Sequence, residues 1–342
     1  MRNWKGYEKG INLGGWLSQC DHTKETYDNF IVQDDLKRIA GWGLDHVRVP
    51  IDYDLVEDKD GNTLPDGYTY IDNVINWCRE YGLNMVLDLH KTFGFSFDDG
   101  EDEDGFFDNE AYQERFYKLW EMMATRYGKY SDMLAFELLN EITKKEYQDK
   151  WNEISKTCIE RIRRIAPSTY ILVGGYYNNS IESLPSLLPP ADDHIIYNFH
   201  CYEPLIYTHQ GAYWTEGMDQ NFRMSIKTSY YDMNEHSKKQ LSQITVGFKG
   251  LNPDNLLGSE FFDMHFSEAV KIAEERNVPL YCGEYGVIDR ADPKEAVMWY
   301  KMINSSFKKY GIGRACWTYK EKDFGITDEH MASVLDELLN YL

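Results

Sequence analysis

The chain lacks any long hydrophobic run and has few basic residues for its size. No stretch of its 342 residues approaches the ~18 apolar residues of a membrane span, and residues 1–10 lack the apolar segment of a signal peptide. Acidic residues outnumber basic ones by 57 to 36, which gives a net charge of −21. Because nucleic acids and anionic membranes bind basic surfaces, neither is an expected partner. From the sequence as given we expect a cytoplasmic protein, or a secreted one if a signal was removed.

Sequence motifs of several enzyme classes are absent as well. The six cysteines include no C-x-x-C pair, which leaves a zinc ribbon without support, and we interpret them as reduced thiols. No G-x-G-x-x-G or P-loop motif follows the first predicted strand, so a nucleotide-binding sheet is not indicated. The absence of G-x-S-x-G and H-E-x-x-H motifs disfavours serine and zinc hydrolases. The sequence therefore predicts no cofactor and no metal site.

Helix-like and strand-like segments alternate along the whole chain. Helical spacing of apolar residues is typically followed by a glycine and then by a short apolar run. Such alternation predicts a parallel sheet with helices on its faces. The predicted strands lie at about 9–16, 45–52, 84–90, 134–141, 169–175, 194–202, 279–286 and 313–320. Their number predicts a closed (β/α)8 TIM barrel of the α/β class, formed by one domain over 1–342, rather than an open doubly wound sheet.

Two segments depart from this regular pattern. About 75 residues separate the sixth and seventh strands, roughly twice the length that one unit requires. We therefore predict an inserted subdomain at 203–258, between strand 6 and helix 6, whose aromatic residues argue against disorder. The other segment, 98–108, is rich in acids, but the register of an EF-hand calcium loop fails there. We interpret it as a solvated acidic loop.

Polar and aromatic side chains collect where the predicted strands end. In chain order they are Trp16, Arg48, His90, Asn140 with Glu141, His200 with Tyr202, Glu284 and Trp317, while strand five ends only in Gly174 and Gly175. Because barrels of this kind carry their active sites at that end, we interpret the set as a candidate site. Glu141 and Glu284 each follow an apolar run, and a buried carboxylate is costly without a use. Paired carboxyl groups are typical of glycoside hydrolysis.

The two glutamates are expected to play different parts. Hydrolysis with retention of configuration needs an ionised nucleophile and a protonated acid about 5–5.5 Å apart. We predict Glu284 as the nucleophile, because Arg48 and Tyr202 are candidates to stabilise its charge. Glu141 is the predicted acid/base, with a pKa raised by burial. Glu137 lies within the same run as Glu141, and we expect it to be buried and hydrogen-bonded inside the barrel.

Three other side chains are expected to bind the sugar. Asn140 is a candidate to hydrogen-bond a sugar 2-hydroxyl, a contact that strengthens in the transition state. Trp317 offers a flat apolar surface beneath the sugar at the cleavage point. Trp214, in the predicted insertion, is a further candidate for substrate binding.

These motifs resemble those of glycoside hydrolase family 5, the cellulase-type family of clan A. The resemblance rests on Leu139-Asn140-Glu141, Gly283-Glu284-Tyr285-Gly286, His200-x-Tyr202, Trp317, the stretch 10–16 and the stretch 45–50. It covers residues 10 to about 320 and is greatest toward compact clostridial endoglucanases with an insertion after strand six. It implies that Glu141 is the acid/base and Glu284 the nucleophile, with Arg48, His90, Asn140, His200, Tyr202 and Trp317 completing the site.

One stretch departs from the family pattern. After the equivalent of His90 the family often carries a second histidine and then Ala-Pro-Gly, where this chain has Lys91-Thr92-Phe93-Gly94. The acidic loop that follows is expected to border the sugar sites on the non-reducing side.

The expected function is that of a retaining β-glycosidase acting on β-1,4-linked or mixed-linkage β-1,3-1,4 glucan, of the endoglucanase type. A β-mannanase, a β-mannosidase or an exo-acting β-glycosidase on oligosaccharides is the alternative. A sugar-binding barrel without catalysis is a remote alternative, which the presence of both glutamates disfavours. The expected partner is a β-linked oligo- or polysaccharide, bound by a monomer.

Overall fold

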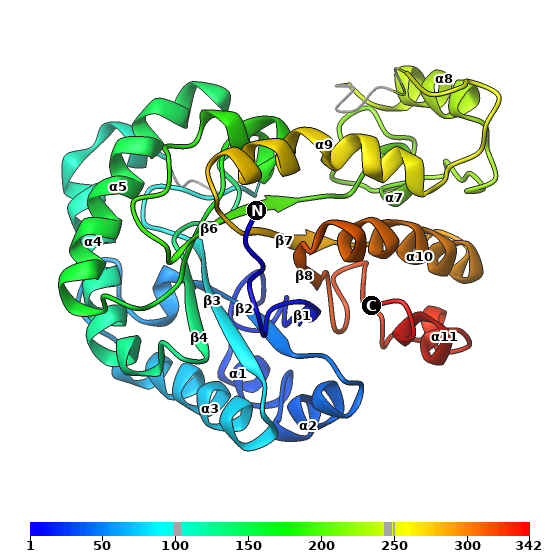
Figure 1. Ribbon diagram of the computed structural model, residues 1–342. Helices are drawn as coiled ribbons and strands as arrows, with labels where there is room; N and C mark the ends of the chain where they lie inside the picture. The colour runs from blue at the N-terminus through cyan, green and yellow to red at the C-terminus, as the bar shows by residue number, and fades with distance from the viewer. Residues whose placement is uncertain (99–103, 243–247, 249) are drawn as a thin grey trace.

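The computed structural model describes residues 1–98, 104–242, 248 and 250–342, and its centre is a closed barrel of parallel strands (Figure 1). The strands are β1 (Gly10–Asn12), β2 (His46–Asp52), β3 (Asn84–Lys91), β4 (Leu134–Glu137), β5 (Ile171–Val173), β6 (Ile195–His200), β7 (Leu280–Tyr285) and β8 (Gly313–Cys316). Each strand pairs with the next, and β8 pairs with β1. The predicted (β/α)8 fold is therefore confirmed.

Several strands end earlier than predicted. We placed the end of the fourth strand at Glu141, but β4 ends at Glu137 and Glu141 lies in the following loop. The backbone of Glu141 has a φ of 37°, in the left-handed region, which no regular strand contains. The chain thus leaves the barrel wall before it reaches the residue that we predicted to do chemistry.

The helices surround the barrel and begin and end at recognisable residues. They are α1 (Lys24–Asn29), α2 (Gln33–Gly41), α3 (Pro65–Tyr81), α4 (Glu110–Tyr127), α5 (Gln148–Ile165), α6 (Tyr176–Asn179), α7 (Leu205–Thr208), α8 (Tyr230–Gln240), α9 (Ser259–Glu275), α10 (Pro293–Tyr310) and α11 (Leu335–Leu339). Helix α10, for example, starts where the Asp292 side chain accepts from two backbone N–H groups and ends at Gly311 with a φ of 66°. Among the described residues, no helix combines the length and apolar character needed to cross a bilayer.

The barrel interior is largely apolar at one end, where His46 is paired with the Tyr281 hydroxyl, and polar at the other. At the N-terminal end, inward-facing residues of six strands pack with Trp4 and Tyr7; they are Val86, Ala135, Leu172, Ile196, Tyr281 and Ala315. The rings of Trp4 and Tyr7 stack 3.8 Å apart, and the N-terminal segment crosses the centre of the barrel in Figure 1. Two residues further along, the inward positions include Asp88 on β3 and Glu137 on β4, which pair in register. The buried carboxyl groups Asp88 and Glu137 therefore lie toward the C-terminal end of the barrel.

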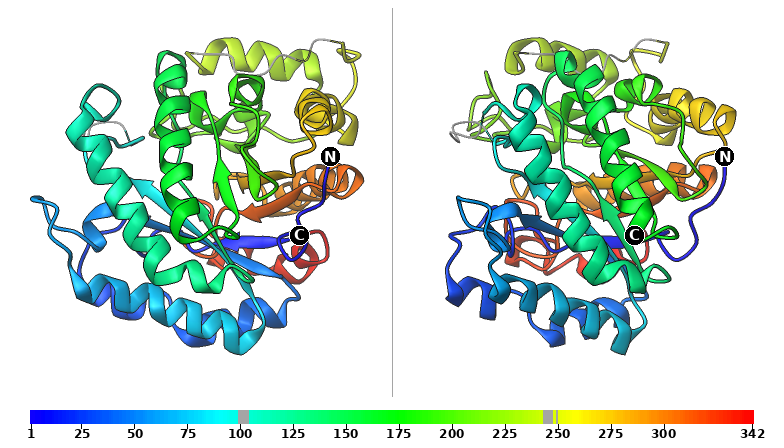
Figure 2. Two further views of the ribbon diagram at one scale, coloured as in Figure 1. Left: turned by 60° about the vertical axis from the view of Figure 1, so that its left-hand side comes forward. Right: turned by 90° about the vertical axis from the view of Figure 1, so that its left-hand side faces the viewer.

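The stretch between β6 and α9 holds α7 and α8, which stand beside α9 in Figure 1 and far from α2 and α3 in both views of Figure 2. Tyr230 on α8 is buried and its ring lies 6.3 Å from that of Phe261 on α9. The start of the stretch packs in the other direction, because Ala212 belongs to an apolar cluster with Trp317 and Phe324. This part of the predicted insertion therefore reaches the C-terminal end of the barrel.

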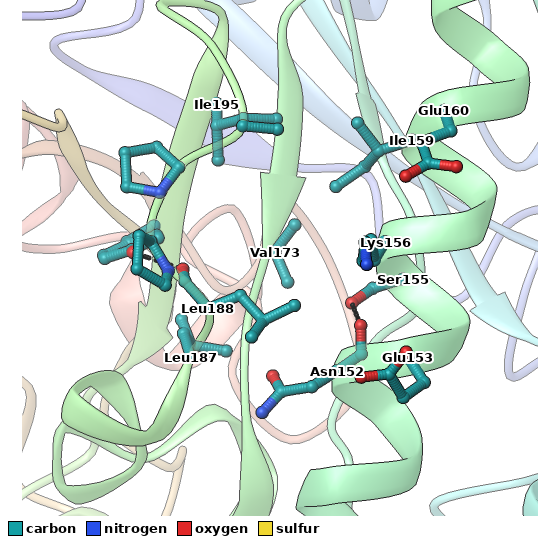
Figure 3. Close-up of a pocket in the computed structure, with 14 residues that line it drawn as sticks. Asn152, Glu153, Ser155, Lys156, Ile159, Glu160, Val173, Leu187, Leu188 and Ile195 are labelled. Carbon is teal, nitrogen blue, oxygen red and sulfur yellow. Dashed lines mark hydrogen bonds between the residues drawn. The ribbon is translucent and has the colours of Figure 1, made fainter.

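The connection from β5 to β6 contains no long helix, only α6 and a short 3-10 segment, Ile181–Ser186. A hollow remains there on the outer wall, between α5 and the strands (Figure 3). Its apolar lining includes Val173, Ile195 and Leu187. None of the predicted site residues lines this hollow, so it is separate from the candidate site.

Candidate active site

Arg48, on β2, is the hub of the polar layer. Its side chain is fully buried, and Nε and Nη2 donate to the two carboxylate oxygens of Glu137 at 2.7 and 2.8 Å. Nη1 donates to Oε1 of Glu284 at 2.8 Å, and Nη2 lies 3.1 Å from Oδ2 of Asp88. Burial acts to lower the pKa of Arg48, but the neighbouring carboxylates outweigh it and raise that pKa. The guanidinium therefore remains charged and holds three carboxyl groups in place.

Glu137 occupies the position that the sequence predicted. Its side chain is 1% exposed, and besides Arg48 it accepts a hydrogen bond from Nδ2 of Asn198 at 2.8 Å. The prediction that Glu137 is buried and hydrogen-bonded inside the barrel is confirmed. It lies beneath the candidate site and supports Arg48.

Glu284 lies on β7 and receives two hydrogen bonds. Oε1 accepts from Arg48, and Oε2 accepts from the hydroxyl of Tyr202 at 2.9 Å. Both donors stabilise a negative charge on this carboxylate, and one of them is a cation. The register shift between Phe199 and His200 pairs His200 with Glu284 across β6 and β7. The strand register thus places Glu284 beside the residue that contacts the other glutamate.

Glu141 is held by neutral groups instead. Its Oε1 lies 2.7 Å from Nδ1 of His200, and its Oε2 accepts from Nδ2 of Asn178 at 2.9 Å. Burial lowers the pKa of His200 to about 4, so the imidazole is neutral near pH 7. Burial also raises the pKa of Glu141 to about 7, against the hydrogen bond from Asn178. Glu141 therefore exchanges its proton near neutral pH, as a general acid should.

The separation of the two glutamates decides what chemistry they can perform together. One carboxylate oxygen of Glu141, one of Glu284 and a ring nitrogen of His200 all lie within 4.8 Å of one another. Carboxyl groups about 5–5.5 Å apart are typical of retaining glycosidases, whereas inverting enzymes keep about 6.5–9.5 Å between them to admit a water. The arrangement matches the retaining geometry.

His90 and Trp317 form an aromatic wall beside the carboxylates. The two rings are parallel, 5.8 Å apart, and Nδ1 of His90 lies 2.5 Å from Oδ2 of Asp88. Burial lowers the pKa of His90 and raises that of Asp88 to about 7, although Arg48 opposes the second effect. A Cβ on Gly14 would lie 2.7 Å from the Trp317 ring, so only glycine allows this ring its place.

Asn140 contacts Arg48 directly, and Trp214 is linked to Tyr202 through Phe324. Oδ1 of Asn140 accepts from Nη2 of Arg48 at 2.9 Å, while its buried Nδ2 has no hydrogen-bond partner in the described part of the chain. Trp214 is 40% exposed, and its ring lies 6.2 Å from Phe324, which itself packs 5.6 Å from Tyr202. Trp214 thus stands at the edge of the aromatic wall.

Trp16 is the exception, and our prediction that it belongs to the site is wrong. Its side chain is 1% exposed, its Nε1 donates to the carbonyl of Tyr27 at 2.9 Å, and its ring stacks on Trp77 at 6.4 Å. It packs between the strands and the outer helices because β1 already ends at Asn12. Asn12 is the residue of this motif that reaches inward, where its Oδ1 accepts from Arg48 at 3.0 Å.

Three further polar residues around the carboxylates were missed from the sequence. Asp88 and Asn198 could have been found, since each lies two positions before a predicted histidine and so faces the same side of its strand. Asn178 gave no such signal, because it follows a strand that ends in two glycines.

The acidic loop can be followed only at its two ends, since residues 99–103 lie outside the described part. At the first end, Oδ2 of Asp98 lies 2.8 Å from Nζ of Lys91 and Oδ1 accepts from Gln19 at 3.3 Å. At the second end, Phe106 and Phe107 are buried, so our interpretation of a solvated loop does not hold for them.

Comparisons with known proteins point to one family. A profile of the family described as Cellulase (glycosyl hydrolase family 5) matches residues 4–323. Cellodextrinase A of Ruminococcus flavefaciens is 49% identical over 316 residues, covering 92% of this chain and 86% of that protein. Endoglucanase C of Acetivibrio thermocellus is 37% identical over 341 residues, 98% of each chain. The crystal structure of endoglucanase Cel5A from Thermotoga maritima superposes with a TM-score of 0.77 at 26% identity, covering 98% of this chain and 97% of that one.

Proposed function

The chain belongs to glycosyl hydrolase family 5, the cellulase family, and on this premise we propose that it hydrolyses β-1,4-linked glucan with retention of configuration, through Glu141 and Glu284. The observation that carries the assignment of these two residues is their separation, with oxygens within 4.8 Å and with different partners on each. A single anomeric carbon fits between them.

In the first step Glu284 attacks the anomeric carbon and forms an ester bond to the sugar. The glycosidic C–O bond breaks, and the leaving oxygen takes the proton of Glu141. Arg48 and Tyr202 hold Glu284 in position for the attack. The product of this step is a covalent glycosyl-enzyme and a departed sugar.

In the second step the ionised Glu141 accepts a proton from water, whose oxygen attacks the same carbon. The ester bond breaks and Glu284 becomes a free carboxylate again. Because each step inverts the anomeric carbon, the product keeps the β configuration. A pKa of about 7 suits Glu141 to both parts, since the group must donate in one step and accept in the other.

Other residues are proposed to bind the sugar at the cleavage point. The Nδ2 of Asn140, which lacks a partner among the described residues, is available to donate to a 2-hydroxyl. The Trp317 ring, backed by His90, provides a flat surface against which a sugar face can pack. Trp214 would extend this surface toward the next sugar.

The substrate is proposed to be β-1,4-glucan or a mixed-linkage β-1,3-1,4 glucan, including short cello-oligosaccharides. The names of two relatives, Cellodextrinase A and Endoglucanase C, support this class. We further propose that the active unit is a monomer, because both glutamates and all of their partners named above come from one chain.

A panel of substrates tests the proposal. The purified protein is incubated with carboxymethyl cellulose, barley glucan, cello-oligosaccharides, laminarin, mannan and xylan, and the products are identified. We expect cleavage of the first three, with NMR showing the β-anomer as the initial product. Cleavage of mannan alone, an α-anomer as first product, or binding of glucan without cleavage would each contradict the proposal.

A further inference from the structure

The turn that follows β5 has a backbone conformation that residues other than glycine rarely adopt. Tyr177 has φ 51° and ψ 55°, Asn178 has φ 56° and ψ 53°, and Asn179 has φ 56°. Left-handed residues without glycine normally occur singly, and asparagine tolerates them better than most. Three in a row require the surrounding structure to hold them, so the contacts made by this turn are the place to look for its use.

Asn178 joins this turn to the loop that carries Glu141. Its backbone N–H donates to the carbonyl of Ile142 at 3.0 Å, and its Nδ2 donates to Oε2 of Glu141 at 2.9 Å. Glu141 is itself left-handed, with a φ of 37°. Two loops in uncommon conformations thus meet in two hydrogen bonds, one of them on the predicted acid/base.

The next residue of the turn reaches the other partner of Glu141. Asn179 is fully buried, and its Nδ2 lies 3.4 Å from Nε2 of His200. The opposite ring nitrogen of His200 contacts Oε1 of Glu141. One turn therefore stands behind both oxygens of this carboxyl group, directly at Oε2 and through His200 at Oε1.

We propose that Asn178 is a positioning residue for the acid/base: it fixes the orientation of the Glu141 carboxyl and favours its ionised form. The inference rests on the proposed function of Glu141. Because Asn178 donates to Oε2, a protonated Glu141 carries its proton on Oε1, away from Asn178. The same hydrogen bond stabilises the ionised Glu141 that the second step needs. Among the groups around Glu141, this hydrogen bond is what most opposes the rise of its pKa by burial.

Among the described residues, the charged and titratable groups around Glu141 come from several elements. They are Arg48 on β2, Asp88 on β3, Asp98 after β3, Glu137 on β4, His200 on β6, Tyr202 after β6 and Glu284 on β7. A substitution at position 178 leaves all of them in the chain. A shift in the titration of Glu141 would therefore report the lost hydrogen bond.

The test compares Asn178→Gly with Tyr177→Gly. Both replace a left-handed residue by one that adopts this backbone without strain, so neither should prevent folding, but only the first removes the donor to Glu141. The pH dependence of kcat/KM is measured on cello-oligosaccharides and on an aryl cellobioside with a good leaving group. For Asn178→Gly we expect the upper limb to move about 0.5–1 pH unit higher. We also expect about a tenfold loss on cello-oligosaccharides and little loss on the aryl cellobioside, where acid assistance matters less.

Asn178→Asp sharpens the test, because a second carboxylate beside Glu141 should move the upper limb further in the same direction. Tyr177→Gly should leave that limb in place. An unmoved limb in both Asn178 variants, or an equal shift in Tyr177→Gly, would overturn the inference. A different result would contradict the proposed role of Glu141 itself. If Glu141→Gln keeps the wild-type upper limb of kcat/KM, Glu141 is not the acid/base, whatever the Asn178 variants show.

Discussion

Glu284 and Glu141 lie close together, but their carboxyl groups have different kinds of hydrogen-bond partners. Glu284 lies on a strand, and a buried cation and a hydroxyl donate to it. Glu141 lies in a loop, and within the described part of the chain its oxygens are held by a neutral imidazole and a neutral amide. A charged donor stabilises a carboxylate, whereas neutral partners leave a group free to gain and lose a proton. The difference in partners therefore supports the proposal that Glu284 attacks and Glu141 transfers the proton.

The mechanical support of the two groups differs as well. Glu284 is fixed by its strand register and by Arg48, which also binds Glu137. Glu141 depends on a contact between two loops, through Asn178. Rigid elements position groups more precisely than loops do, so the position of Glu141, the proposed acid/base, depends more on loop contacts than that of Glu284.

Removal of Glu284 should have the largest effect. Glu284→Ala takes away the nucleophile, so we expect kcat on cello-oligosaccharides to fall by roughly 10⁴-fold or more. Azide added to this variant with an aryl β-cellobioside should yield a glycosyl azide of inverted configuration, identified by NMR. Near-normal activity of Glu284→Ala would show that Glu284 is not the nucleophile.

Removal of Glu141 should have a smaller effect that depends on substrate and pH. Wild-type kcat/KM should fall as the pH rises above about 7, because Glu141 loses the proton that it must donate. In Glu141→Ala we expect this limb to vanish, with a loss of about 10²–10⁴-fold on cello-oligosaccharides but a much smaller loss on aryl cellobiosides. Azide should now give the retained product. The inverted azide, or an unchanged limb, would reverse the two assignments.

Loss of the Tyr202 hydroxyl should have the smallest effect of the three. Tyr202→Phe removes one of the two donors to Glu284 and keeps Arg48, so we expect kcat to fall about tenfold at an unchanged melting temperature. Tyr231→Phe, at a 58% exposed tyrosine on α8, is the matched control and should behave as wild type. An unchanged kcat in Tyr202→Phe would mean that Arg48 alone supports the nucleophile.

The sequence was most informative at the C-terminal ends of the regular strands. Alternation of helices and strands predicted the barrel, and the ends of its strands pointed to Arg48, His90, His200 and Glu284, because period and direction determine where such side chains lie. Trp16 was chosen wrongly in the motif that also contains Asn12, since β1 is only three residues long and its end was misjudged.

The remaining features depend on loop conformation, which spacing does not encode. Asn178 reaches Glu141 only because three successive residues are left-handed, and nothing in Gly174-Gly175-Tyr176-Tyr177 indicates such a turn. The pairing of Arg48 with Asp88 is different, because both residues lie on strands. Asp88 lies two positions before His90, a spacing that indicates an inward-facing side chain.

The stacked pair of Trp4 and Tyr7 at the floor of the barrel has a practical consequence. These rings close the end of the barrel that lies opposite both glutamates. A group attached to the chain before Trp4 would therefore lie on the face opposite the candidate site. A carrier protein, a dye or a solid support joined there would leave the opposite mouth unobstructed. Trimming the chain past Tyr7, in contrast, would open this end of the barrel to water and loosen the strands that carry Arg48 and Glu284.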